Sequence, residues 1–333
     1  GHVGLLRFGS MVRWSPSVRI LPPVAAFLVT VLGLGLAGCQ PAEAPEVPET
    51  SDAGSTERRP EALRAEIRDW RADREARLRE ADGWLSLVGL EWLEPGRNLV
   101  GSHPAADVQF PEKAPETVGW IEWREGMLTF EPAPEATVRL EGDPVVEEVE
   151  LTTDAEGAPT ELAAGSLRFY VIDRAGDLAV RIKDRESPLL AEFEGIDSYP
   201  VDLSWRIEGR FDAVENEVEI PDILGRETVQ RSPGRVIFEH GGREHELVAL
   251  EGGADGSLFL VFGDETNGEE TYGGGRFLYT EPPEGGRVVL DFNRAYNPPC
   301  VFTPYATCPL PPPQNRLPFP VTAGEKMWGA PHE

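Results

Sequence analysis

Residues 121–130 read Ile-Glu-Trp-Arg-Glu-Gly-Met-Leu-Thr-Phe, and this stretch shows how most of the chain is built. Apolar and polar side chains alternate on both sides of the short segment Arg124-Glu125-Gly126, and a period of two is typical of strands with one buried face. Glycine at the third turn position suits a left-handed backbone. The stretch therefore predicts a β-hairpin with a three-residue turn.

The same pattern recurs from Trp84 onward, with glycine-marked turns roughly every ten residues. Short strands without helical patterns between them are typical of antiparallel sandwiches and barrels, whereas a doubly wound sheet needs intervening helices. We predict a mainly β protein with one domain at 84–186, a linker at 187–200 and a second domain at 201–328. The expected further strands are Thr137–Leu140, Val145–Leu151, Leu167–Ile172, Leu178–Ile182, Leu203–Ile207, Glu217–Ile220, Val236–Glu239, Glu246–Leu250, Leu258–Phe262, Phe277–Thr280 and Val288–Phe292.

One amphipathic helix is expected before the strands, over residues 60–83. Pro60 suits its first turn and Gly83 suits a C-terminal stop. Its apolar residues recur about every 3.6 positions and are Leu63, Ile67, Trp70 and Leu78.

The region from Leu99 to Ile172 contains Val100-Gly101-Ser102 and Glu141-Gly142-Asp143 at positions similar to those of a forkhead-associated sandwich. In that family an arginine directly after the glycine holds phosphothreonine, and here Ser102 takes its place. The resemblance implies a possible topology for the first β domain. It does not imply phosphopeptide binding, because the main charge-assisted contact is missing.

The amino-terminal part of the sequence has the pattern of an export signal. Arg13 and Arg19 precede the apolar run Val24–Leu36, which is too short for a comfortable membrane span. The run ends at Leu36-Ala37-Gly38-Cys39, which resembles a bacterial lipobox. That resemblance implies that residues 1–38 are a signal peptide, that Cys39 is lipidated, and that the protein is anchored to an envelope membrane outside the cytoplasm. The alternative is an uncleaved anchor or a chance apolar run.

Residues 39–59 are rich in Pro, Glu, Ala, Ser and Thr, which predicts a flexible tether. The whole chain has 31 Lys and Arg against 58 Asp and Glu, a formal charge of −27. Nucleic acids are bound by clustered basic residues, so we exclude a nucleic-acid partner. For the same reason, we expect acyl chains, and not a basic patch, to attach the protein to the membrane.

The common catalytic and cofactor motifs are absent from the sequence. It contains no Gly-x-Ser-x-Gly elbow, no Walker loop and no Cys-x-x-Cys pair, so no cofactor is predicted. With Gly241-Gly242 as a two-residue turn, Phe238 would oppose His245, and His240 and His245 would share a face. A metal would need a further ligand such as a carboxylate. The apolar neighbours on that face favour histidines at the rim of a core.

Polar chemistry is densest between Asp264 and Lys326. A glycine-rich loop at 263–276 permits close approach of backbone to a ligand, and it contains Asp264, Glu270 and Arg276. Two carboxylates in one cleft shift each other's pKa, as acid–base catalysis requires. If the protein is an enzyme, we expect a hydrolase whose catalytic candidates are Asp264, Glu270, Asp291 and Arg276.

Prolines are frequent between Pro298 and Pro313, and proline does not fit inside a strand ladder. We therefore expect an extended, rigid segment over the domain surface. Cys300 and Cys308 lie in it, and in an envelope compartment a disulfide that closes a short loop is the simplest state. A reactive thiol at Cys300 or half of a metal site are the alternatives.

Several distinctive motifs occur together: residues 264–276, residues 291–300, Cys308-Pro309-Leu310, Asn315-Arg316-Leu317 and Ala323-Gly324-Glu325-Lys326. Trp70, Gly83-Trp84-Leu85 and the segment Gly89–Leu93 precede them, so the motifs extend over nearly all of residues 65–326. Together they resemble the bacterial family catalogued as domain of unknown function 1684. The family has no established activity, so the resemblance implies an architecture and a candidate region but no reaction.

We expect this C-terminal surface to bind a small or extended ligand. A hydrolase and a purely structural or assembly lipoprotein are the alternatives. The expected binding residues are Asp264, Thr266, Tyr272, Arg276, Asp291, Asn293, Tyr296, Asn297, Asn315, Arg316, Glu325 and Lys326.

Overall fold

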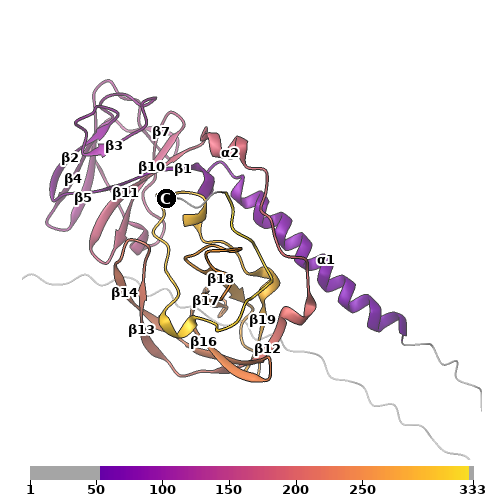
Figure 1. Cartoon of the computed structure of the whole chain (residues 1–333). Coiled ribbons are helices and arrows are strands. Elements are labelled where there is room, and N and C mark those ends of the chain that lie inside the picture. The colour runs from indigo at the N-terminus through magenta and orange to yellow at the C-terminus, as the bar shows by residue number, and fades with distance from the viewer. Residues whose placement is uncertain (1–52, 330–333) are drawn as a thin grey trace, which may run out of the picture. The chain divides into compact units, whose positions relative to one another are not determined.

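The structure is a computed structural model that describes residues 53–329 (Figure 1). The predicted signal peptide, Cys39 and most of the predicted tether lie outside the described residues. Within them, a long helix comes first and antiparallel sheets follow. The prediction of a mainly β protein preceded by one long helix is therefore confirmed.

The helix α1 spans Ala53–Leu78, so it begins and ends earlier than predicted. Residues 53–59, which were assigned to the tether, are helical, and Pro60 lies inside the helix. Sequence periodicity missed this part because it contains no apolar stripe. At the other end, the backbone N–H of Gly83 donates to the carbonyl of Glu80 in a turn that follows the helix.

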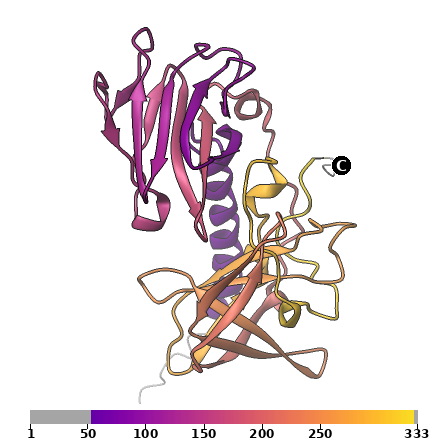
Figure 2. The same cartoon turned by 90° about the vertical axis from the view of Figure 1, so that its left-hand side faces the viewer.

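The first β domain consists of two sheets that enclose a common hydrophobic core (Figure 2). One sheet has the order β1-β11-β10-β9-β6-β7 and the other β3-β2-β4-β5-β8, with only the short β2–β3 pair parallel. The strands are β1 Leu87–Trp92, β2 Gly96–Gly101, β3 Val108–Gln109, β4 Gly119–Arg124, β5 Met127–Pro132, β6 Arg139–Leu140, β7 Asp143–Pro144, β8 Val149–Glu150, β9 Leu162–Ala164, β10 Leu167–Arg174 and β11 Asp177–Asp184.

The hairpin that opened the sequence analysis is present as β4 and β5, but its turn is shorter than predicted. Arg124 pairs with Met127, which leaves a two-residue turn. Both turn residues have positive φ, 54° at Glu125 and 82° at Gly126. This backbone twist matches that of paired strands, which is why two-residue turns of this kind are common in hairpins.

The second β domain is a six-stranded sheet that curves into a nearly closed barrel, with the order β18-β17-β16-β15-β12-β19 (Figure 2). β18 and β19 are the two ends of this order and are not paired with each other. A separate hairpin is formed by β13 and β14. The strands are β12 Arg206–Asp212, β13 Asn216–Pro221, β14 Glu227–Ser232, β15 Gly234–His240, β16 Arg243–Glu251, β17 Leu258–Phe262, β18 Arg276–Thr280 and β19 Arg287–Asp291.

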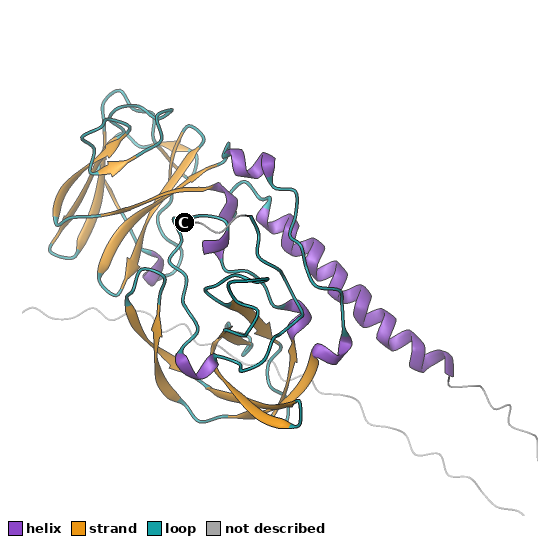
Figure 3. Ribbon diagram, in the orientation of Figure 1, coloured by secondary structure: helices purple, strands orange, loops and turns teal. Residues whose placement is uncertain are grey.

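Short helical turns occupy the connections and the C-terminal segment (Figure 3). Leu203–Trp205 was predicted as part of a strand but is a 3-10 turn, because Asp202 accepts a hydrogen bond from the backbone N–H of Ser204 and caps it. The other short helices are η1 Trp84–Ser86, η2 Asp154–Glu156, α2 Pro188–Glu192, η4 Phe292–Arg294, η5 Pro299–Val301 and η6 Pro313–Asn315.

In the part of the chain that the structure describes, no helix has both the length and the apolar character needed to cross a membrane.

The core of the first domain depends on Phe169, whose ring meets Phe110 at 5.1 Å and Phe130 at 5.7 Å, both edge to face. We predict that Phe169→Ala lowers the free energy of unfolding by roughly 3–5 kcal/mol, because it removes a buried ring and leaves a cavity. Denaturant unfolding measures this change. Met127→Ala, at a side chain that is 61% exposed, is the control and should change stability by less than about 0.5 kcal/mol. Equal effects of the two substitutions would contradict the assignment of this core.

Candidate functional site

Arg276 and Asp264 form an ion pair inside the second domain, with 2.8 Å between Nη2 and Oδ2 and no exposure of either side chain. Arg276 also donates to the carbonyls of Val321, at 2.8 Å, and Ala323. The second oxygen of Asp264 accepts from the hydroxyl of Thr266 and from the backbone N–H of Val321, at 2.6 and 3.1 Å. The partners of both side chains are other protein groups. The pair therefore holds the C-terminal segment in place and is not accessible to a ligand.

The buried amides predicted to bind a ligand have the same structural role. Asn315 accepts from the N–H of Val248 at 2.7 Å and donates to the carbonyls of Val248 and Val261, which attaches it to β16 and β17. Asn297 donates to the carbonyl of Lys326 at 2.7 Å, and Asn293 donates to that of Asp202 at 2.9 Å. These contacts show that much of the predicted binding set supports the fold.

The three carboxylates proposed as acid and base each have a different partner. Asp264 is fully buried in its ion pair, and Asp291 accepts from Arg206 at 3.1 Å. Glu270 accepts a very short hydrogen bond from the hydroxyl of Tyr199 and lies 3.8 Å from Nζ of Lys326. Burial, followed by the bond to Glu270, raises the pKa of Tyr199 to about 12. The geometry therefore gives no support to an acid–base pair made from these groups.

The remaining predicted binding residues are divided between the interior and the surface. Thr266 is buried and bonds to Thr271 at 2.7 Å, whereas Tyr272 is partly buried beside an apolar cluster. Glu325 is buried and forms an ion pair with Arg74 of α1. Arg316 is exposed. Tyr296, Asp291 and Tyr272 line three different cavities of the described residues.

His240 and His245 lie where the sequence placed them, with Phe238 opposite His245 across the hairpin. Both rings pack against Phe319, at centroid distances of 4.3 and 4.8 Å, and His240 also stacks on Trp205 at 4.9 Å. Residues 53–329 contain no group of three or more His, Cys, Asp or Glu side chains arranged to hold a metal ion. The two histidines are part of the rim of the core.

Cys300 and Cys308 form a disulfide with a Cα–Cα distance of 6.2 Å, and both side chains are buried. The bridge closes the loop that follows Pro299.

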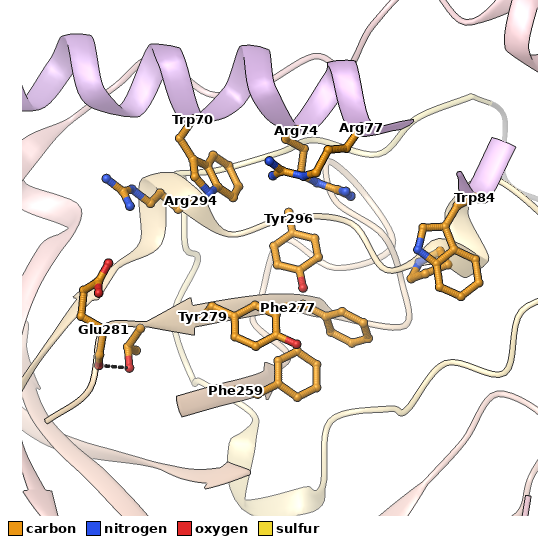
Figure 4. A pocket seen from close by; sticks show the side chains of 12 residues that line it. Trp70, Arg74, Arg77, Trp84, Phe259, Phe277, Tyr279, Glu281, Arg294 and Tyr296 are labelled. Atoms are coloured by element: carbon orange, nitrogen blue, oxygen red, sulfur yellow. Dashed lines mark hydrogen bonds between the residues drawn. The ribbon is translucent and has the colours of Figure 1, made fainter. Parts of the chain in front are cut away.

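A different region forms a cavity that we call the aromatic cleft (Figure 4). It has a volume of about 600 Å³ and lies between α1 and the outer face of β17 and β18. Arginines Arg74, Arg77 and Arg294 line it together with six aromatic side chains. These aromatic residues are Trp70, Trp84, Phe259, Phe277, Tyr279 and Tyr296.

The aromatic wall follows from strand alternation. Leu258, Leu260 and Leu278 point into the barrel core, so their neighbours Phe259, Phe277 and Tyr279 face outward. Phe259 and Tyr279 stack with their ring centroids 4.8 Å apart. Phe277 meets Tyr296 edge to face at 5.7 Å, and Tyr296 meets Trp70 of α1 at 6.3 Å.

The arginines of the cleft differ in how their charge is neutralised. Arg74 pairs with Glu325 at 3.0 Å, with its guanidinium 4.5 Å from the centroid of the Tyr296 ring. Arg294 pairs with Glu66 of α1. Arg77 is exposed, and its guanidinium has no hydrogen bond or ion pair with any described residue. One cationic group is therefore free at the cleft.

Tyr296 contributes a second free donor. Its hydroxyl has no hydrogen-bond partner among residues 53–329, while burial strongly raises its pKa. The hydroxyl thus stays protonated at neutral pH, and in Figure 4 it points into the space above Tyr279 and Phe259. The cleft can offer a guanidinium and a phenol to a ligand that carries acceptors.

Sequence reasoning identified only Tyr296 of this cleft. Trp70 was assigned to the apolar stripe of the helix, and Arg74 was not singled out. The i,i+4 spacing of Asp73 and Arg77 predicted an ion pair on the solvent-facing side, and the described residues contain no such pair. The spacing of Trp70, Arg74 and Arg77 at i, i+4 and i+7 places all three on one helix face, and that signal was available. The contact of this helix face with β17 and β18 gave no such signal, because the helix and these strands lie far apart in the sequence.

Comparisons with known proteins add a family but no activity. Residues 191–326 match the family described as protein of unknown function DUF1684, so the resemblance carried by the C-terminal motifs is confirmed over that range. A solution NMR structure of an uncharacterized protein from Haloarcula marismortui is 30% identical, covering 41% of this chain and 78% of that one, with a TM-score of 0.36. No curated protein matches the chain.

We predict that Arg276→Ala lowers the free energy of unfolding by roughly 3–5 kcal/mol, because Asp264 is left buried without its partner. Chemical denaturation gives the value. The matched control is Arg287→Ala, whose pair with Glu208 joins side chains that are 74% and 59% exposed and should contribute less than about 1 kcal/mol. A loss at Arg276 no larger than that at Arg287 would show that the ion pair is not a structural anchor.

Proposed function

Because the chain belongs to the DUF1684 family, whose description assigns no activity, we propose from the geometry that it is a binding protein for a small organic anion with a planar apolar body. The aromatic cleft is the site. The observation that carries the proposal is the unpaired guanidinium of Arg77 beside a wall of aromatic rings.

The cleft has the size and composition of a small-molecule site. Its volume of about 600 Å³ lies within the roughly 300–1,000 Å³ that such pockets occupy. Apolar and aromatic walls with a few polar groups are typical of them. Here the outward ring of Tyr279, 48% exposed, offers a face on which a planar group can stack.

The charge of the site selects an anion. The guanidinium of Arg77 is exposed and unpaired, although the chain carries −27 overall. A ligand carboxylate or phosphate at Arg77 would gain charge-assisted hydrogen bonds, which are stronger than neutral ones. The hydroxyl of Tyr296 would donate to the same group or to a neighbouring acceptor.

The lining of the cleft favours binding over hydrolysis. The cleft residues include one carboxylate, Glu281, and one hydroxyl that is not phenolic, Thr280, which donates to the backbone carbonyl of Glu281 at 2.8 Å. No serine, cysteine or histidine is among the residues that line the cleft. A nucleophile with an adjacent base, as covalent catalysis requires, is therefore not assembled there.

The proposal includes a place of action. The lipobox-like sequence ending at Cys39 supports a lipid anchor on an envelope membrane, with residues 53–329 outside the cytoplasm. The ligand would then be a molecule of the envelope or its surroundings.

We predict that Arg77→Ala weakens binding of N-acetyl-L-tyrosine, a probe with one carboxylate and one planar ring, by about tenfold or more. The substitution removes the charge-assisted hydrogen bonds, which contribute roughly 1.5–3 kcal/mol. Isothermal titration calorimetry measures the affinity.

Arg68→Ala is the matched control, since Arg68 is an exposed arginine of the same helix whose ion pair is with Glu61, away from the cleft. It should leave the affinity unchanged. Absence of binding by the wild-type protein, or an equal loss in both variants, would overturn the proposed site.

We predict that Cys39→Ser abolishes incorporation of labelled palmitate during growth, because the lipidated side chain is removed. Gel autoradiography of the immunoprecipitated protein is the readout. Cys308→Ser, which changes the other end of the chain, should retain the label. Palmitate labelling that persists without Cys39 would refute the lipid anchor.

A further inference from the structure

We infer that the ligand of the aromatic cleft is a short peptide bound in an extended conformation, with its free carboxylate toward Arg77 and its amino end toward Glu284. The inference rests on the proposed function and deepens it by naming the class of ligand and its orientation.

The cleft continues into a second depression, the adjoining hollow, which lies over β12, β18 and β19. Its volume is about 470 Å³. Tyr279, Thr280, Glu281 and Arg294 line both cavities, so the two share one wall. A ligand longer than a single aromatic acid can pass from one into the other.

The unpaired charges at the two ends have opposite signs. In the adjoining hollow the arginines are neutralised, Arg206 by Asp291 at 3.1 Å and Arg287 by Glu208 at 2.6 Å. The carboxylate of Glu284 is exposed and has no ion pair or hydrogen bond with another described residue. Arg77, at the other end, is the unpaired cation.

Glu281 adds a further free carboxylate where the cavities meet. Figure 4 shows Arg77 and Trp84 toward one end of the cleft and Glu281 toward the other. A simple anion would satisfy only the Arg77 end. A molecule with a carboxylate at one end and an ammonium group at the other satisfies both.

The backbone of β18 offers a peptide its main-chain partners. Phe277 exchanges two hydrogen bonds of 2.9 Å with Tyr296 on the side away from β17. Alternate residues of a strand direct their backbone groups to the same side, so the N–H and C=O of Tyr279 also point away from β17. β18 is the end strand of its sheet: β17 pairs with it on one side, with Phe259 opposite Tyr279, and no described strand pairs with it on the other side. A peptide that lies in the adjoining hollow can bond to these two groups of Tyr279 through its own main chain.

The side chains of the cleft indicate which residue the peptide carries at its carboxyl end. The aromatic rings lie near Arg77, whereas the adjoining hollow has aliphatic and charged walls, including Val288 and Val289. A peptide with an aromatic C-terminal residue fits this order. The tripeptide Gly-Gly-Tyr is the simplest such probe.

The test is a calorimetric comparison of three probes with the full chain: N-acetyl-L-tyrosine, Gly-Gly-Tyr, and Gly-Gly-Tyr with an acetylated amino end. Gly-Gly-Tyr should bind about tenfold more tightly than either of the others, because it alone has both a main chain of this length and a free ammonium group. Glu284→Gln should weaken Gly-Gly-Tyr by about fivefold and leave N-acetyl-L-tyrosine unchanged. Glu147→Gln, at an exposed glutamate of the first domain, is the matched control and should change neither affinity.

The outcomes separate this inference from the proposed function. If N-acetyl-L-tyrosine binds but the free tripeptide is no tighter than its acetylated form, the peptide inference is overturned and the anion site stands. If Gly-Gly-Tyr binds more tightly than its acetylated form but Glu284→Gln does not change its affinity, the inferred orientation of the peptide is wrong. If no probe binds, both the inference and the proposed function are refuted.

Discussion

Arg276 and Asp264 pair without any contact with solvent, and the course of the C-terminal segment depends on this pair. Arg276 binds the carbonyls of the segment, which holds Glu325 in place. Glu325 in turn pairs with Arg74 of α1, whose guanidinium covers Tyr296. One buried interaction thus fixes both the helix and the Tyr296 ring, which line the aromatic cleft together. Buried pairs contribute little net stability, but they penalise alternative arrangements strongly when a partner is displaced.

The polar residues of the C-terminal domain therefore divide into two groups. Those in the glycine-rich and proline-rich motifs mostly satisfy buried backbone groups, as Asn315 does between β16 and β17. Such contacts are obligatory, since an unpaired buried amide is costly. Arg77 and Glu284, which have no protein partner, lie elsewhere, along the aromatic cleft and the adjoining hollow. The sequence segments richest in polar residues thus stabilise the fold, whereas the proposed site is defined by charged side chains that have no protein partner.

The difference between prediction and structure has a physical cause. Alternation of period two, as in residues 121–130, is local, so strands and the fold class were predictable. The histidine register followed from a two-residue turn and was also predictable. The strand expected at Leu203–Ile207 was partly wrong because the Asp202 cap favours a helical turn there. The cleft lies between α1 and the strands β17 and β18, which are far apart in the sequence. No local pattern in a single sequence predicts such a contact.

The central claim is that free donors and aromatic rings between α1 and β18 form a binding site. A crystal structure of the protein with N-acetyl-L-tyrosine tests it most directly. The account predicts the carboxylate at the guanidinium of Arg77 and the ring against Tyr279. A ligand found elsewhere, or a cleft filled by the protein's own chain, would contradict it.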